Sequence, residues 1–90
     1  MQSVYTDDAP EPVGHYAQAV AHNGLVFVSG QLPIDPATGE SIDGTPEEQT
    51  QRALENVLAI LRAAGSDRSF VLKTTVYLSD LDLFPRVNDA

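Results

Sequence analysis

The sequence predicts an α+β domain in which strands form one sheet and a helix covers one of its faces. Three observations support this fold class. Short runs rich in valine and leucine, separated by Asn-Gly and Asp-Pro-Ala-Thr-Gly, indicate strands joined by tight turns. Residues 46–64 repeat apolar side chains every three and four positions, as an amphipathic helix does. The alternating run 71–78 then indicates another strand after the helix.

Two hairpins precede the helix. Residues 16–20 and 25–30 are predicted strands, and Asn23-Gly24 between them supplies the positive φ angles of a tight turn. Because the run 25–28 is apolar at both its odd and its even positions, we expect a central strand covered on both faces. A second short hairpin or loop is expected around residues 35–39, where Pro36 and Gly39 suit a turn and its exit.

The helix over residues 46–64 has clear start and stop signals. Thr45 is the expected N-cap, Pro46 occupies the first helical position, and a glutamate at the third position completes a capping box. Gly65 is the expected C-cap. Its apolar stripe is formed by Leu54, Val57, Leu58 and Leu61, with Ala53 and Ala64 beside them.

The end of the sequence predicts the start of a second helix. Asp80 or Asp82 can cap it, and Pro85 favours Asp82 because proline is tolerated only in the first turn. About two turns of helix are marginal by themselves, which indicates a truncated or externally completed domain. With only one full helix to cover the sheet, its open face is expected to pack against a partner subunit.

Composition fits a single domain over residues 1–90, stabilised by packing. The chain is 42% hydrophobic and lacks cysteine, which excludes disulfides and thiol nucleophiles. Thirteen acidic and five scattered basic residues give a net charge of −8, so nucleic acid is not an expected partner. No run approaches the roughly 18 apolar residues that span a bilayer, and the N-terminus lacks the regions of a signal peptide. We expect a cytoplasmic protein without a membrane partner.

The segment GHYAQAVAHNGLVFVSGQLPIDPATG, residues 14–39, with the capped helix and the run VLKTTVYLSDLDLF, resembles the Rid (reactive intermediate deaminase, RidA-like) family. The resemblance implies a chorismate-mutase-like fold, with helices on one face of a mixed sheet and homotrimers that bind small molecules in clefts between subunits. It covers the N-terminal two thirds of the family pattern. The family's remaining third carries a substrate-binding arginine and a carboxylate, which have no counterpart up to Ala90.

Four polar residues are candidate substrate-binding groups: Tyr16, Ser29, Gln31 and Asn88. By themselves they fit ordinary structural roles, as a strand aromatic, two corner residues and an exposed helix residue. The resemblance instead implies that Tyr16, Ser29 and Asn88 line the ligand cleft, and we add Gln31 beside them. Such hydroxyl and amide groups bind and orient a substrate, so none is predicted to be catalytic.

Three further residues, His15, His22 and Arg86, bear on metal binding and on the differences from the family pattern. His15 and His22 stand seven apart, a spacing that suits no common metal pair, and we predict no metal or cofactor. The family pattern has a proline where His15 stands, and a histidine there adds a group that titrates near neutral pH. Arg86 matches no arginine of the family, so we expect it to face solvent.

Three functions from different classes remain open. The first is a deaminase that hydrolyses reactive 2-imino or enamino acids, such as 2-iminobutanoate and 2-iminopropanoate, to 2-keto acids and ammonia. The second is a non-catalytic trimeric module that keeps a small-ligand cleft. The third is an endoribonuclease or translation inhibitor, the L-PSP role long attached to the family, which the acidic composition disfavours.

Overall fold

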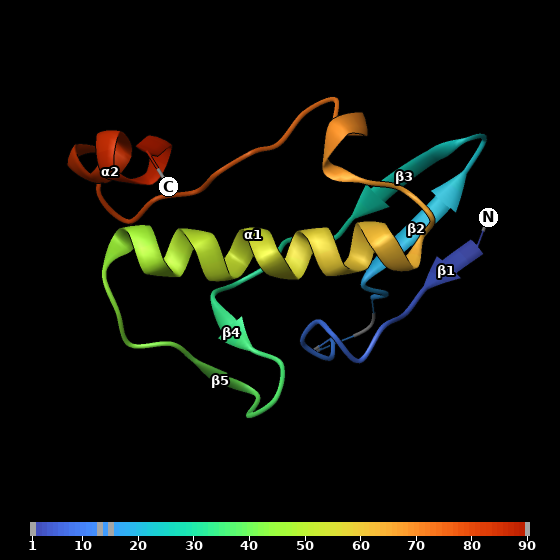
Figure 1. The fold of residues 1–90 in the computed structure, drawn as a ribbon, viewed down its shortest axis with the longest axis horizontal. Helices are drawn as coiled ribbons and strands as arrows, with labels where there is room; N and C mark the ends of the chain where they lie inside the picture. Colours follow the sequence, from blue (N-terminus) through green and yellow to red (C-terminus); the bar gives the residue numbers. More distant parts are fainter. Residues whose placement is uncertain (1, 13, 15, 90) are drawn as a thin grey trace.

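The structure, a computed structural model, describes residues 2–12, 14 and 16–89 (Figure 1). In it a small sheet and a two-stranded hairpin lie beside one long helix. No helix among the described residues is long and apolar enough to cross a membrane. The elements are β1 (Gln2–Val4), β2 (Ala19–His22), β3 (Leu25–Val28), β4 (Ile34–Asp35), β5 (Glu40–Ser41), α1 (Pro46–Ala63) and α2 (Phe84–Asp89).

Both predicted hairpins are present. Strands β2 and β3 pair antiparallel, and Asn23 (φ 52°) and Gly24 (φ 78°) form the turn between them. Strands β4 and β5 also pair antiparallel, and the Gly39 N–H donates to the Asp35 carbonyl at 2.8 Å. The sequence did not reveal β1, which pairs antiparallel with β2 and gives the order β1-β2-β3.

The core lies where the C-terminal half of α1 meets one face of the sheet. Ile60 and Ala19 are completely buried there, and Ala9 from the N-terminal loop packs beside them. These side chains remove apolar surface from water, which holds the helix on the sheet. The partly buried residues packed around them are Val4, Val26, Val28 and Ala59.

The prediction that β3 is a central strand covered on both faces is wrong for this chain. It lies at the edge of the sheet, with β2 as its one paired neighbour among the described residues. Val26 and Val28 face the core, whereas Leu25 and Phe27 on the opposite face are 46% and 60% exposed. Successive side chains of a strand point to opposite faces, and here one helix covers only one of them.

The predicted strand over residues 71–78 is also not observed. The segment runs beside α1 without regular secondary structure, and Leu72 and Tyr77 are 87% and 93% exposed (Figure 1). Alternation of apolar residues marks a strand only when another strand supplies hydrogen bonds to its backbone. Within the described part of the chain, no strand pairs with this segment.

Helix α1 begins and ends as the sequence predicts, to within one residue. The Thr45 hydroxyl accepts from the Glu48 N–H at 3.1 Å, and the Glu48 side chain reaches back to the Thr45 N–H. Beyond the last turn Gly65 has φ 83°, and the N–H of Ser66 donates to the Leu61 carbonyl at 2.8 Å. This is the glycine-ended cap expected at a helix C-terminus.

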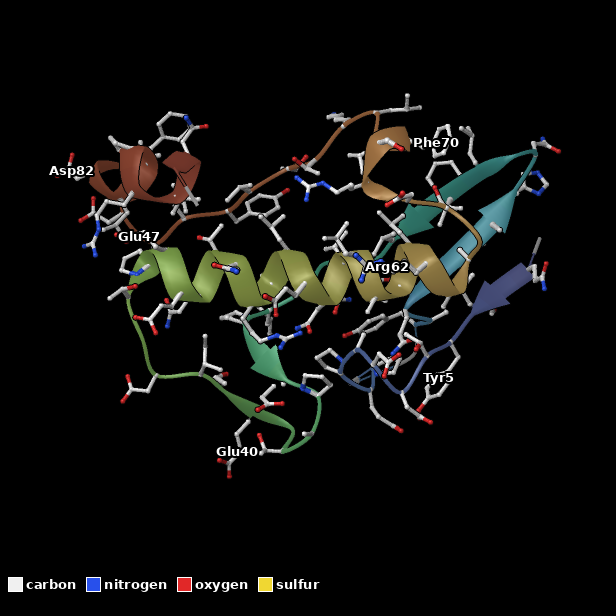
Figure 2. All side chains as sticks on the ribbon, in the orientation of Figure 1. Tyr5, Glu40, Glu47, Arg62, Phe70 and Asp82 are labelled. Atoms are coloured by element: carbon white, nitrogen blue, oxygen red, sulfur yellow. The ribbon has the colours of Figure 1, made fainter. Side chains whose placement is uncertain are left out.

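Two expectations about the second helix need correction. Asp82 does not cap α2, because a 3-10 turn, Leu81–Leu83, precedes that helix. Asp80 is the N-cap of this turn, and its carboxylate accepts from the Asp82 N–H at 2.9 Å. Arg86 does not simply face solvent, since its Nε lies 2.8 Å from Oε1 of Glu47. Glu47 belongs to the first turn of α1, and this ion pair ties α2 to that end of the helix (Figure 2).

Candidate functional site

Three of the four predicted site residues lie in one corner, where the β2–β3 ladder ends. Ala19 pairs with Val28 at the end of the ladder, and the Ser29 N–H continues the pairing by donating to the Gln18 carbonyl at 2.9 Å. The Ser29 hydroxyl donates to the Ala17 carbonyl at 2.6 Å, which fixes its oxygen against the segment that precedes β2. Ala17 directly follows Tyr16, so this bond places Ser29 beside the segment that carries Tyr16.

Tyr16 presents its ring at the surface of this corner, where it is 50% exposed. Gly14 lies beneath the ring: a Cβ atom built at Gly14 would stand 3.6 Å from two ring carbons. Gly14 also has φ 120°, a region that side chains other than glycine rarely adopt. Any replacement of Gly14 therefore strains the backbone beside Tyr16.

Gln31 completes the corner, which we call the Tyr16–Ser29–Gln31 corner. Its Nε2 donates to the Ser29 carbonyl at 3.2 Å, a long bond that holds the amide only loosely. The three side chains offer two hydroxyls and a carboxamide, all uncharged. Such groups orient a carbonyl, imine or carboxylate and polarise it, but they lack the bidentate, charge-assisted grip of an arginine.

A buried glutamine that the sequence analysis overlooked supports the corner. Gln18 is 1% exposed, and its Oε1 accepts from the Thr6 N–H at 2.7 Å. Its Nε2 donates to the carbonyls of Thr6 and Pro10, each at 3.0 Å, and contacts the Ala9 carbonyl at 3.4 Å. The N-terminal loop is thereby tied to the segment that leads from Tyr16 into β2.

Asn88 is the predicted site residue that the structure does not bring to the corner. It is exposed on α2, which lies beside the N-terminal end of α1, whereas β2 and β3 lie near the C-terminal half of that helix (Figure 1). The prediction about His15 concerns a residue outside the described part of the chain. Among the described residues, no group of three or more His, Asp or Glu side chains could hold a metal ion.

An open hollow of about 550 Å³ lies elsewhere, between the N-terminal loop and α1. Two arginines, Arg52 and Arg62, line it together with Asp8 and Glu55, so its charges balance. Arg52 already binds Glu55 at 3.1 Å. The hollow includes none of the corner residues, of which Ser29 and Gln31 are half-buried and Tyr16 is half-exposed.

Comparison with known proteins assigns the family. The model of the endoribonuclease L-PSP family matches residues 6–90. A RutC family protein of Pyrococcus abyssi is 48% identical over 86 residues, which are 96% of this chain and 68% of the relative.

Solved structures agree with this assignment. RidA from the Antarctic bacterium Psychrobacter sp. PAMC 21119 superposes with a TM-score of 0.94 at 42% identity, covering 99% of this chain and 72% of that one. E. coli TdcF with bound serine gives a TM-score of 0.93 at 39% identity, covering 99% and 69%. The expected Rid fold is confirmed, and the 90 residues span about 70% of the length of these relatives. The chain belongs to the endoribonuclease L-PSP family, the family of the RutC and Rid proteins.

Proposed function

We propose that the protein is a RidA-like deaminase that hydrolyses reactive 2-imino and enamino acids. In this reaction water adds to the C=N carbon, the C–N bond breaks, and a 2-keto acid and ammonia leave. The observation that carries the proposal is the meeting of Tyr16, Ser29 and Gln31 in one corner of a family member. Because the imine is already electrophilic, a site can accelerate its hydrolysis by binding it and orienting it beside a water, without a nucleophilic side chain.

The corner requires further groups to complete a site. Its described side chains include no cation for the substrate carboxylate, and α2, which carries Asn88, lies toward the other end of α1 (Figure 1). We infer that the complete site lies between subunits of a homotrimer, with Asn88 supplied by a neighbouring subunit. The exposed side chains of Leu25 and Phe27 support an assembly, because they leave one face of the sheet uncovered.

A subunit-mixing experiment on the complete gene product tests both parts of this proposal. Tyr16→Phe and Asn88→Ala should each lower the rate of 2-iminobutanoate hydrolysis by about tenfold or more, as loss of an orienting donor does. If the two residues come from different subunits, a trimer refolded from a mixture of both variants contains some clefts in which both Tyr16 and Asn88 are unchanged. Those clefts should regain activity. Gln51→Ala, an exposed change on α1, is the matched control and should leave the rate unchanged.

Failure of the mixture to regain activity would place both residues in one subunit and contradict the shared cleft. A wild-type rate no faster than spontaneous hydrolysis would contradict the deaminase itself. The two outcomes are separable, because the first is read only after the wild-type protein has been shown to be active.

A non-catalytic ligand-binding module is the second candidate, favoured by the absence of a cation among the described side chains of the corner. The TdcF structure contains bound serine, so at least one relative binds a small amino acid. Thermal stabilisation by 2-oxobutanoate without any turnover of the imine would support this candidate. No stabilisation by any 2-keto acid would count against it.

An endoribonuclease activity is named by the family model but finds less support in this chain. A net charge of −8 repels phosphates, whose neutralisation supplies most of the affinity for RNA. RNA cleavage that is abolished by Ser29→Ala would favour this activity. Cleavage that survives this change would point to a contaminating nuclease.

A further inference from the structure

One polar side chain interrupts the face that α1 turns toward the rest of the chain. Asn56 is completely buried, one turn before Ile60 of the core. A buried carboxamide is costly unless its donors and acceptors are matched. Both bonds made by Nδ2 go to one segment, the Leu32 carbonyl at 3.0 Å and the Ile34 carbonyl at 2.9 Å.

The orientation of this amide is determined by its partners. Nη2 of Arg52 donates to Oδ1 of Asn56 at 2.8 Å, and an arginine can only donate. The two carbonyls on the other side can only accept. Asn56 therefore fits with Oδ1 toward Arg52 and Nδ2 toward the loop, and the reverse orientation would lose all three bonds.

The segment that Asn56 holds comes directly after the Tyr16–Ser29–Gln31 corner. The side chain of Leu32 is 64% exposed, so its packing contributes little to anchoring the segment. Among the described residues, the side chain of Gln31 bonds only to the Ser29 carbonyl, at a long 3.2 Å. The place of the Gln31 amide therefore depends on the backbone that follows it, which Asn56 ties to the helix.

We propose that Asn56 is a positioning residue for this corner, holding Gln31 at the distance from Ser29 and Tyr16 that ligand binding needs. The inference rests on the proposed function for its ligand, a 2-keto or 2-imino acid. Asn56 itself does not touch the ligand. Arg52 acts behind it by fixing the amide in its one productive orientation.

The test compares two isosteric changes on α1 in the complete gene product. Asn56→Asp keeps the size and the acceptor for Arg52 but removes both donations to the loop. Gln49→Glu is the matched control, because Nε2 of Gln49 likewise donates from α1 to a loop carbonyl, that of Ile42, at 3.4 Å. This control removes a helix-to-loop bond beside the β4–β5 hairpin and leaves the corner untouched.

We expect Asn56→Asp to weaken the binding of 2-oxobutanoate by about tenfold, the effect of losing the Gln31 amide as one well-placed donor to the ligand. Gln49→Glu should leave the binding within about twofold of the wild type. Arg52→Met changes a side chain that is 24% exposed, so it should disturb folding less than Asn56→Asp does. It should also weaken the binding of 2-oxobutanoate, but by a smaller factor. Equal losses in Asn56→Asp and Gln49→Glu would overturn the inference, because they would reflect stability alone.

A second readout keeps this inference separate from the proposed function. The side-chain amide resonances of Gln31, observed by NMR without any ligand, should shift in Asn56→Asp and Arg52→Met but not in Gln49→Glu. If the wild-type protein neither binds nor hydrolyses these acids, the proposed function fails and the resonances alone judge the positioning role. Unchanged Gln31 resonances in Asn56→Asp would refute it.

Discussion

Replacing Gln18 by leucine removes the polar tie between the N-terminal loop and β2 while keeping a side chain of similar size. Three bonds of good length are lost, at 2.7, 3.0 and 3.0 Å, together with a contact at 3.4 Å. Each such bond contributes about 1 kcal/mol net, and partly buried backbone groups lose their partners, so unfolding should become easier by about 2–3 kcal/mol. For a domain of this size that is a large fraction of the total stability.

Equilibrium urea unfolding of the complete protein, at one fixed protein concentration, measures this loss. Gln51→Leu is the control: its Nε2 contacts only the exposed Glu55 at 3.4 Å, and it should change the free energy of unfolding by less than about 0.5 kcal/mol. Hydrogen exchange at the Thr6 amide should quicken in Gln18→Leu. A loss no greater than that of Gln51→Leu would refute the reasoning, because the buried amide would then contribute nothing to holding the loop.

Three further changes follow from individual contacts. Ile60→Ala removes a completely buried core side chain and should lower the free energy of unfolding by about 2–5 kcal/mol in the same urea assay; a loss below 1 kcal/mol would mean that the site collapses without a cavity. Thr45→Ala removes the N-cap acceptor and should cost about 1 kcal/mol, whereas Thr45→Ser should retain most of the stability. The hydrogen bond to Glu11, and then that to Asp7, raises the pKa of Tyr5, because both favour the neutral phenol. The stabilisation from these bonds is present below pH 10 and is lost as pH rises through the raised pKa. Alkaline absorbance titration should therefore show one tyrosine that ionises at higher pH than the others, and Tyr5→Phe should remove it. An unchanged titration curve would contradict the contact.

Local signals in the sequence predicted the elements that depend on neighbouring residues. Asn23-Gly24 and the capping residue Thr45 act over a few positions, and both hairpins and the start of α1 are where these signals place them. The 71–78 segment shows the limit of such reasoning, because alternation states which side chains are apolar but not whether a neighbouring strand exists. The same limit explains why β3 is an edge strand here.

The candidate site was predictable only in part. The family resemblance identified Tyr16 and Ser29, and the bonds of Ser29 to the Ala17 carbonyl and of Gln31 to the Ser29 carbonyl bring them together with Gln31. Asn56 and Gln18 were overlooked because a single polar residue in an apolar pattern gives no sign of being buried until its hydrogen-bond partners are known. A lone carboxamide inside an apolar stripe was the available signal, since it can be buried only where backbone groups bind it.

The rate at which 2-iminobutanoate, generated in solution, becomes 2-oxobutanoate and ammonia tests the proposed deaminase most directly. The measurement compares the complete protein with buffer alone and with the Tyr16→Phe variant. A rate that saturates with substrate, exceeds spontaneous hydrolysis and falls in the variant is the predicted result. A rate equal to that in buffer, from a protein shown to be folded and assembled, would contradict the deaminase function.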